Sequence, residues 1–176
     1  SVFVSVLLLL SGDIEANPGP ANTLNFGYIN AWSAVGKTAI IHSVIDELQL
    51  DCLAITETWI RESHPDTIKL DPAPPGYVIH HTHRPGEGNG GGVAIVTRTE
   101  LQSRPFSLSW SDPACDIVAI HLPTATGRLN VIALYRPPKS AGFYDHLHSL
   151  LDEVNSLPGK TIICGDFNAP SLVERG

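Results

Sequence analysis

The sequence predicts an α/β protein in which a layered β-sandwich is flanked by helices. Most apolar residues fall in short continuous or alternating runs, which is typical of strands. Only two segments have the spacing of an amphipathic helix, and 15 Gly and 14 Pro among 176 residues mark frequent turns. Many short strands in series with few helices favour a layered sandwich. Because 43% of the residues are hydrophobic, the chain can form one domain with its own core.

The apolar pattern places each element in turn. Residues 37–50 carry an apolar stripe at helical spacing, and a second stripe begins at residue 143 and ends before Pro158 and Gly159. Residues 65–76 are rich in proline and are predicted as a loop, and the glycines of residues 86–92 as a hairpin turn. The segments predicted as strands are residues 24–30, 52–55, 77–83, 92–97, 116–121, 129–135 and 161–164.

Charge and cysteine content exclude several classes of protein. Lys and Arg sum to 11 against 18 Asp and Glu, a net charge of −7, so a protein that coats DNA by bulk attraction is not predicted. A nuclease with a bound metal ion and a local basic rim remains compatible. The three cysteines are far apart and lack the paired spacing of a disulfide framework or a zinc site. A reducing, intracellular compartment is therefore expected.

The first twenty residues read as a leader, which leaves residues 21–176 as the folded domain. The apolar run of residues 2–10 is shorter than the roughly 20 residues that span a bilayer, so no stable membrane partner is expected, although a signal-like role stays open. The string Gly-Asp-Ile-Glu-Ala-Asn-Pro-Gly-Pro at residues 12–20 resembles the 2A-type ribosome-skipping peptides. The resemblance implies that peptide-bond formation fails before the last proline, and an ordinary turn is the alternative. The residues that carry this prediction are Asn17, Pro18, Gly19 and Pro20.

Polar side chains stand at the ends of several of the predicted strands. A carboxylate at a strand end is held rigidly by the sheet, and residues two apart on an extended chain face the same way. Carboxylate and amide oxygens without Cys or His spacing favour Mg²⁺, or Mn²⁺, over zinc. A phenol beside a guanidinium suits a phosphate group. These features predict a phosphodiester-hydrolysing site built from Asn30, Glu57, Tyr135, Arg136, Asp166 and Asn168.

The strings around these residues, read in order, resemble the endonuclease/exonuclease/phosphatase superfamily. They are Asn-Ala-Trp-Ser at 30–33, Thr-Glu-Thr-Trp at 56–59, Gly-Gly-Gly-Val-Ala-Ile at 90–95, Tyr-Arg-Pro-Pro at 135–138 and Gly-Asp-Phe-Asn at 165–168. The likeness is strongest to the apurinic-type endonuclease domain of non-LTR retrotransposons and runs from about residue 24 to residue 170. A 2A-type leader ahead of such a domain resembles an arrangement found in some of these elements.

The resemblance implies a role for each residue at the site. Glu57 would be the Mg²⁺ ligand, with Asn30 beside the metal. Asp166 would take a proton from the attacking water, Asn168 would orient Asp166 and the phosphate, and Tyr135 would hydrogen-bond a phosphate oxygen. The implied activity is Mg²⁺-dependent nicking of DNA in the nucleus, leaving a 3′-hydroxyl that primes a downstream reverse transcriptase domain of the same polyprotein.

The sequence departs from the family pattern at its end. The family has a later Asp and a terminal Ser-Asp-His-like motif, but none of the eight histidines follows Asp166. We therefore expect a C-terminally truncated domain with weak or no activity. A phosphatase or phosphodiesterase of the same fold, and a non-catalytic retroelement remnant, are the alternatives.

Two further patterns resemble binding motifs but are better explained by ordinary structural roles. Residues 31–38 end in Gly36-Lys37-Thr38 but lack the first glycine of a phosphate-binding P-loop, so Lys37 is predicted to start a helix instead. His81 and His83 share one strand face, as a metal pair would, but without a third ligand nearby a surface strand is favoured.

Overall fold

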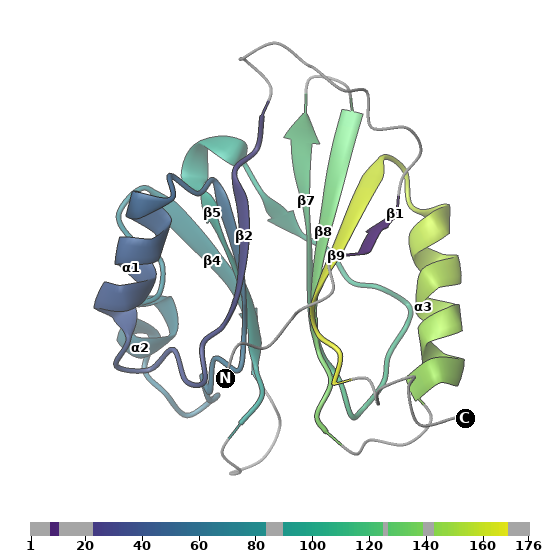
Figure 1. Ribbon diagram of the computed structural model, residues 1–176, viewed down its shortest axis with the longest axis horizontal. Helices are drawn as coiled ribbons and strands as arrows, with labels where there is room; N and C mark the ends of the chain where they lie inside the picture. The colour runs from purple at the N-terminus through teal and green to yellow at the C-terminus, as the bar shows by residue number, and fades with distance from the viewer. Residues whose placement is uncertain (1–7, 11–22, 84–89, 125–126, 139–142, 169–176) are drawn as a thin grey trace, which may run out of the picture.

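In the computed structural model two β-sheets pack face to face, with helices on their outer sides (Figure 1). The structure describes residues 8–10, 23–83, 90–124, 127–138 and 143–168. One sheet has the strand order β2-β3-β5-β4 and the other β1-β9-β8-β7-β6. The strands are β1 (Leu8–Leu10), β2 (Phe26–Asn30), β3 (Cys52–Thr56), β4 (Tyr77–Thr82), β5 (Val93–Arg98), β6 (Arg104–Pro105), β7 (Asp116–Thr124), β8 (Gly127–Tyr135) and β9 (Lys160–Asp166). The helices are α1 (Thr38–Glu47), α2 (Asp66–Leu70), the 3₁₀ turn η1 (Thr99–Leu101) and α3 (Phe143–Ser156).

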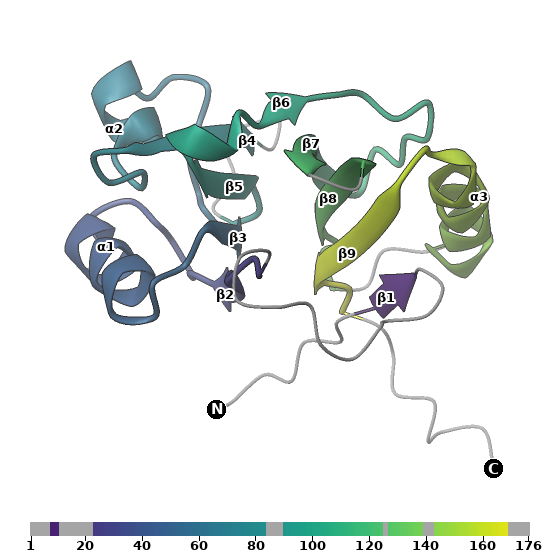
Figure 2. The same cartoon turned by 90° about the horizontal axis from the view of Figure 1, so that it is seen from above.

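Each sheet contains one parallel pair of strands joined by a helix. In the four-stranded sheet, β2 and β3 are parallel, with Asn30 opposite Thr56, and α1 connects them. In the five-stranded sheet, β8 and β9 are parallel, with Tyr135 opposite Asp166, and α3 connects them. The remaining pairs are antiparallel. Seen from above, α1 and α2 lie outside one sheet and α3 outside the other (Figure 2).

Three apolar clusters hold the layers together. The inner faces of the two sheets meet in a central core that includes Ala54 and Ile95 from one sheet and Ile120 and Val131 from the other. A second cluster lies between the four-stranded sheet and α1. In the third cluster, α3 packs its apolar stripe on the outer face of the five-stranded sheet. β3 and β5 are buried along almost their whole length because both faces of their sheet are covered. This explains why their sequences are continuous apolar runs and do not alternate with polar residues.

The predicted layered sandwich and both long helices are confirmed, but several elements differ from the prediction. β6 and η1 are additional, and β8 and β9 are longer than expected. α2 lies inside the segment predicted as a loop, where Pro65 opens a helix of one turn and a half. The first long helix ends at Glu47, three residues before the predicted end at residue 50. β7 continues to Thr124 because it pairs with β8 up to the hairpin turn. β1 pairs antiparallel with β9, so three residues of the segment that the sequence set apart as a leader join the sheet.

The ribosome-skipping prediction falls on residues 17–20, which lie outside the described part of the chain. Among the described residues, no helix combines the length and apolar character that crossing a bilayer requires.

Candidate active site

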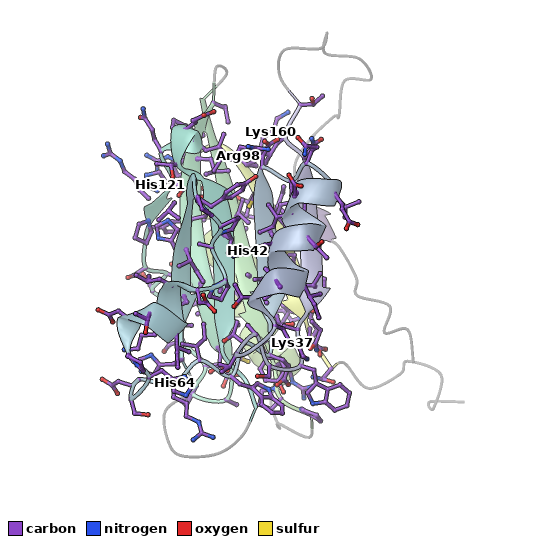
Figure 3. The ribbon with its side chains drawn as sticks, turned by 90° about the vertical axis from the view of Figure 1, so that its left-hand side faces the viewer. Lys37, His42, His64, Arg98, His121 and Lys160 are labelled. Atoms are coloured by element: carbon purple, nitrogen blue, oxygen red, sulfur yellow. The ribbon has the colours of Figure 1, made fainter. Side chains whose placement is uncertain are left out.

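The residues predicted for the site come together at one end of the sandwich, where both parallel pairs finish. The carboxyl ends of β2 and β3 meet those of β8 and β9, and the side-chain amide of Asn30 donates to Oδ2 of Asp166 at 3.1 Å. This bond joins the two sheets across 136 residues of sequence. Figure 3 shows Lys37, which follows β2, at the lower end of the molecule and Lys160, which opens β9, at the upper end. The site therefore lies at the lower end.

Hydrogen bonds hold both carboxylate oxygens of Asp166. Oδ2 accepts from Asn30, and Oδ1 accepts from the backbone N–H of Asn168 at 3.1 Å. Asn168 has a φ of +40°, the left-handed conformation that turns its N–H back toward Asp166. The carboxylate is thus fixed in orientation at a partly exposed position, as a proton acceptor for a bound water requires.

Arg136 braces the turn after Asp166 instead of reaching outward. Its side chain is only 5% exposed, and Nη1 donates to the carbonyls of Phe167 at 3.3 Å and Asn168 at 2.7 Å. In return, the side-chain amide of Asn168 donates to the Arg136 carbonyl at 2.7 Å. These contacts are those of a positioning residue, and direct binding of substrate by Arg136 stays a prediction. Tyr135, 4% exposed, belongs to the central core, and its predicted contact with a phosphate oxygen likewise stays a prediction.

Glu57 is held from two sides. Its Oε2 accepts from the indole N–H of Trp59 at 2.6 Å and from the backbone N–H of Gly91 at 2.9 Å. Glu57 and Trp59 both have left-handed backbone conformations, with φ of +56° and +55°. The backbone of Trp59 also donates to the Gly91 carbonyl at 3.0 Å, so the turn after β3 is docked on the loop before β5.

The sequence pattern predicts no individual role for Trp59, Gly91 or Asp116. Asp116, which is 7% exposed, accepts the backbone N–H of Gly92 at 2.8 Å and so ties the glycine loop to β7. The signal for Trp59 was its place two residues after Glu57, at the end of the Thr-Glu-Thr-Trp string. The signal for Asp116 was a carboxylate directly before the apolar run of residues 117–120.

The turn after β2 forms another side of the site. Oδ1 of Asn30 accepts the backbone N–H of Trp32 at 3.1 Å, and Trp32 and Ser33 have φ of +43° and +79°. The indole of Trp32 is 67% exposed. The ammonium of Lys37 donates to the carbonyls of Ala31 and Trp32, each at 2.7 Å. Lys37 thus closes its own turn at the start of α1, which agrees with the helix-start reading and disfavours a P-loop.

The oxygen donors at this end fit a hard divalent cation. Oε1 of Glu57 accepts no hydrogen bond in the described part of the chain, so it is available as a ligand at the same end of the sandwich as Asn30 and Asp166. Mg²⁺ keeps several waters and needs only one or two protein carboxylates. No group of three or more Cys, His, Asp or Glu side chains suited to a metal occurs among the described residues. His83, which the sequence places on the same strand face as His81, lies 3.5 Å from Glu62 and contacts no other acidic side chain among the described residues.

Comparisons with known proteins agree with this architecture. A sequence model of the endonuclease/exonuclease/phosphatase family matches residues 22–172. Over 148 residues the chain is 30% identical to the RNA-directed DNA polymerase from mobile element jockey of Drosophila melanogaster, covering 84% of this chain and 15% of that protein. The chain thus spans a small part of this relative's length.

Solved structures share the fold at low sequence identity. The AP endonuclease LMAP from Leishmania major superposes with a TM-score of 0.68 at 15% identity, covering 86% of this chain and 57% of that one. The endonuclease domain of TRAS1, a telomere-specific non-LTR retrotransposon, superposes with a TM-score of 0.56 at 16% identity. The match covers 82% of this chain and 58% of that one. On the match over residues 22–172, the chain belongs to the endonuclease/exonuclease/phosphatase family.

Proposed function

We propose that this chain is the Mg²⁺-dependent DNA endonuclease domain of a non-LTR retrotransposon polyprotein, which nicks target DNA in the nucleus. The observation that carries the proposal is the bond from Asn30 to Asp166. It brings a fixed proton acceptor on one sheet next to the oxygen donors on the other. The similarity to the jockey polymerase and the fold shared with the TRAS1 endonuclease domain support the retrotransposon context.

In this proposal the residues divide the work. Glu57 and Asn30 would hold Mg²⁺, or Mn²⁺, whose charge offsets the negative charge that develops on the phosphate oxygens. Asp166 takes the proton of the attacking water, and its two hydrogen bonds keep it aligned for that transfer. Asn168 orients Asp166 through its backbone N–H. Trp32, exposed beside Asn30, offers an aromatic surface on which an unstacked base can pack.

Cleavage in this way leaves a 3′-hydroxyl and a 5′-phosphate. The 3′-hydroxyl would prime a reverse transcriptase domain downstream in the parent polyprotein, and residues 17–20 would separate products during translation. We expect a low rate from the 176-residue chain, because the later Asp and the Ser-Asp-His-like motif that the resemblance implies do not occur in the sequence.

The test is nicking of supercoiled plasmid DNA by the whole chain with Mg²⁺, with EDTA, and with Asp166→Asn. We expect slow conversion to the open circle, loss with EDTA, and at least about a 100-fold lower rate for Asp166→Asn, since general-base catalysis contributes about 10²–10⁴-fold. DNA ligase should reseal the nick, because it requires a 3′-hydroxyl beside a 5′-phosphate. The matched control is Asp46→Asn, which removes an exposed carboxylate from α1.

Other outcomes identify the alternatives. Release of inorganic phosphate from a 3′-phosphorylated oligonucleotide, with no plasmid nicking, would indicate a phosphatase of the same fold. Equal traces of nicking by the wild-type chain and Asp166→Asn would indicate a non-catalytic remnant.

A further inference from the structure

A second concave site lies away from the candidate active site. It is a cavity of about 610 Å³, which we call the distal pocket, and Arg104, His121, Pro123, Arg128 and Pro158 are among its lining residues. Figure 3 shows His121 in the upper part of the molecule, toward Lys160 and away from Lys37. The volume of the distal pocket is within the range of small-ligand sites.

The strand register places the cationic groups of this pocket on one face of the sheet. Arg104 on β6 is opposite His121 on β7, and Pro123 on β7 is opposite Arg128 on β8. Opposed residues on antiparallel strands share a face, as do residues two apart on one strand. The two guanidiniums therefore flank the imidazole. This is the outer face of the five-stranded sheet, beyond the carboxyl end of α3.

The wall of the distal pocket that Pro158 and Gly159 form is attached rigidly to β8. Asn130, 1% exposed, donates from its side-chain amide to the Pro158 carbonyl at 3.1 Å and to the Thr161 hydroxyl at 3.2 Å. Gly159 has a φ of +95° and passes so close to the Arg128 carbonyl that a side chain would overlap it. The loop that joins α3 to β9 is thus fixed over the β8 backbone, and the cavity is a built feature.

The charge of the distal pocket is unbalanced. None of its described lining residues is acidic, and the side chains of Arg104 and Arg128, both exposed, form no ion pair or hydrogen bond with the described residues. Nδ1 of His121 is buried and has no hydrogen-bond partner there. Burial lowers the pKa of His121, and the positive charges of Arg128 and then Arg104 lower it further. Such a concentration of positive charge is unexpected on a chain with a net charge of −7.

We propose that the distal pocket binds a phosphate group through Arg104 and Arg128, with His121 at its base. Guanidinium groups suit phosphate because their N–H donors match its oxygens in pairs. The cavity is larger than one phosphate ion, and the rings of Pro123 and Pro158 supply apolar walls. The phosphate therefore belongs either to a free nucleotide or to a nucleic-acid strand. This site is independent of the catalytic proposal, because it uses none of the same residues.

The test is an NMR titration of the whole chain in EDTA, which prevents binding of phosphate through a metal ion at the active site. The probes are inorganic phosphate, adenosine 5′-monophosphate and an oligothymidylate of about 10 nucleotides. The imidazole signals of His121 should shift and saturate with phosphate or the nucleotide. Arg104→Gln and Arg128→Gln should each weaken binding about tenfold or more. Lys69→Gln, which removes one positive charge from α2, should change the affinity less than about twofold.

The oligonucleotide distinguishes the two sources of phosphate. If it displaces inorganic phosphate from His121, the ligand is a nucleic-acid strand. If only the nucleotide competes, the ligand is a free nucleotide. The proposal is overturned if the shifts fail to saturate, or if the two arginine variants bind as tightly as Lys69→Gln.

Discussion

At the scale of single residues, left-handed backbone conformations gather at the candidate site. Among non-glycine residues in the described chain, five of the seven with positive φ lie there: Trp32, Ser33, Glu57, Trp59 and Asn168. The other two, Gln49 and Gln102, follow helix ends, where such conformations are common. Each strained residue costs about 1 kcal/mol or more, so the surrounding hydrogen bonds must offset that cost. The strain aims the Glu57 carboxylate and the N–H of Asn168 at fixed positions.

The hydrogen bond from Trp59 to Glu57 leads to a prediction about metal affinity. Trp59→Phe keeps an aromatic ring but removes the indole N–H that holds Oε2 of Glu57 at 2.6 Å. Groups that orient a metal ligand typically contribute about 10–100-fold to affinity or activity. We expect Trp59→Phe to weaken Mn²⁺ binding about tenfold, as measured by the electron paramagnetic resonance signal of free Mn²⁺.

The control for this experiment is Trp110→Phe. Trp110 is 9% exposed and belongs to the cluster under α3, so its loss should lower the unfolding free energy without changing Mn²⁺ affinity. Equal Mn²⁺ affinity in the wild-type chain and Trp59→Phe would show that Glu57 does not depend on the indole.

At the scale of elements, the apolar pattern of a segment predicted those helices and strands whose formation depends on burying that segment's own apolar residues. The apolar stripes of α1 and α3 and the apolar run of β3 were readable because burial of those faces forms the elements. β1 was not predicted, since three leucines in a leader-like sequence carry no sign that they pair with β9, far along the chain. α2 is too short for a periodic signal and depends on its proline start.

The site shows the same division. Asn30, Glu57 and Asp166 could be proposed because each is a polar residue at the end of an apolar strand. The inward direction of Arg136 could not be predicted, because it depends on the carbonyls of a turn whose conformation the sequence does not specify. The contact of Asn30 with Asp166 depends on the packing of two sheets, which the pattern within either sheet does not determine.

The parallel pair of β8 and β9 explains the glycine of the Gly-Asp-Phe-Asn string. Gly165 has a φ of +147°, and a side chain there would overlap the Leu134 carbonyl of β8. Gly165→Ala should therefore lower the unfolding free energy in urea by about 3 kcal/mol or more. Gly127→Ala is the matched control, since Gly127 has a similar φ of +136° but open space around it. Its cost should stay near the backbone contribution of about 1 kcal/mol. Equal costs would mean that backbone conformation, and not close approach of the strands, requires the glycine.

At the scale of the whole molecule, each sheet carries half of the site. The four-stranded sheet supplies Asn30 and Glu57, and the five-stranded sheet supplies Asp166 and Asn168. The central core between the sheets therefore holds the two halves together. Conditions that loosen this core should separate Asp166 from Asn30, so the pH range of stability also limits the pH range of activity.

Two half-buried histidines, His80 and His81, should destabilise the fold in acid. Burial lowers the pKa of His80 below its ordinary 6.5. Burial also lowers the pKa of His81, assisted by the positive charges of His83, Lys69 and His80, while Asp66 opposes the shift. Below about pH 6.5 the unfolded chain binds protons that the folded chain does not. The unfolding free energy should therefore fall as pH decreases below 6.5.

Buried cysteines should destabilise the fold in alkali. Together with the acid limb, this predicts that the unfolding free energy is highest between about pH 6.5 and pH 9. Burial raises the pKa of Cys164 to about 12 and that of Cys52 further, from an ordinary 9.0. Above pH 9 the thiols ionise in the unfolded chain while they stay neutral in the folded one, so the unfolding free energy falls as pH rises. Urea unfolding at about pH 5, 7.5 and 10 measures both limbs. The double variant Cys52→Ala/Cys164→Ala should be less stable at every pH, because it leaves cavities, yet lose stability less steeply above pH 9. An unchanged alkaline slope in that variant would assign the loss to other groups.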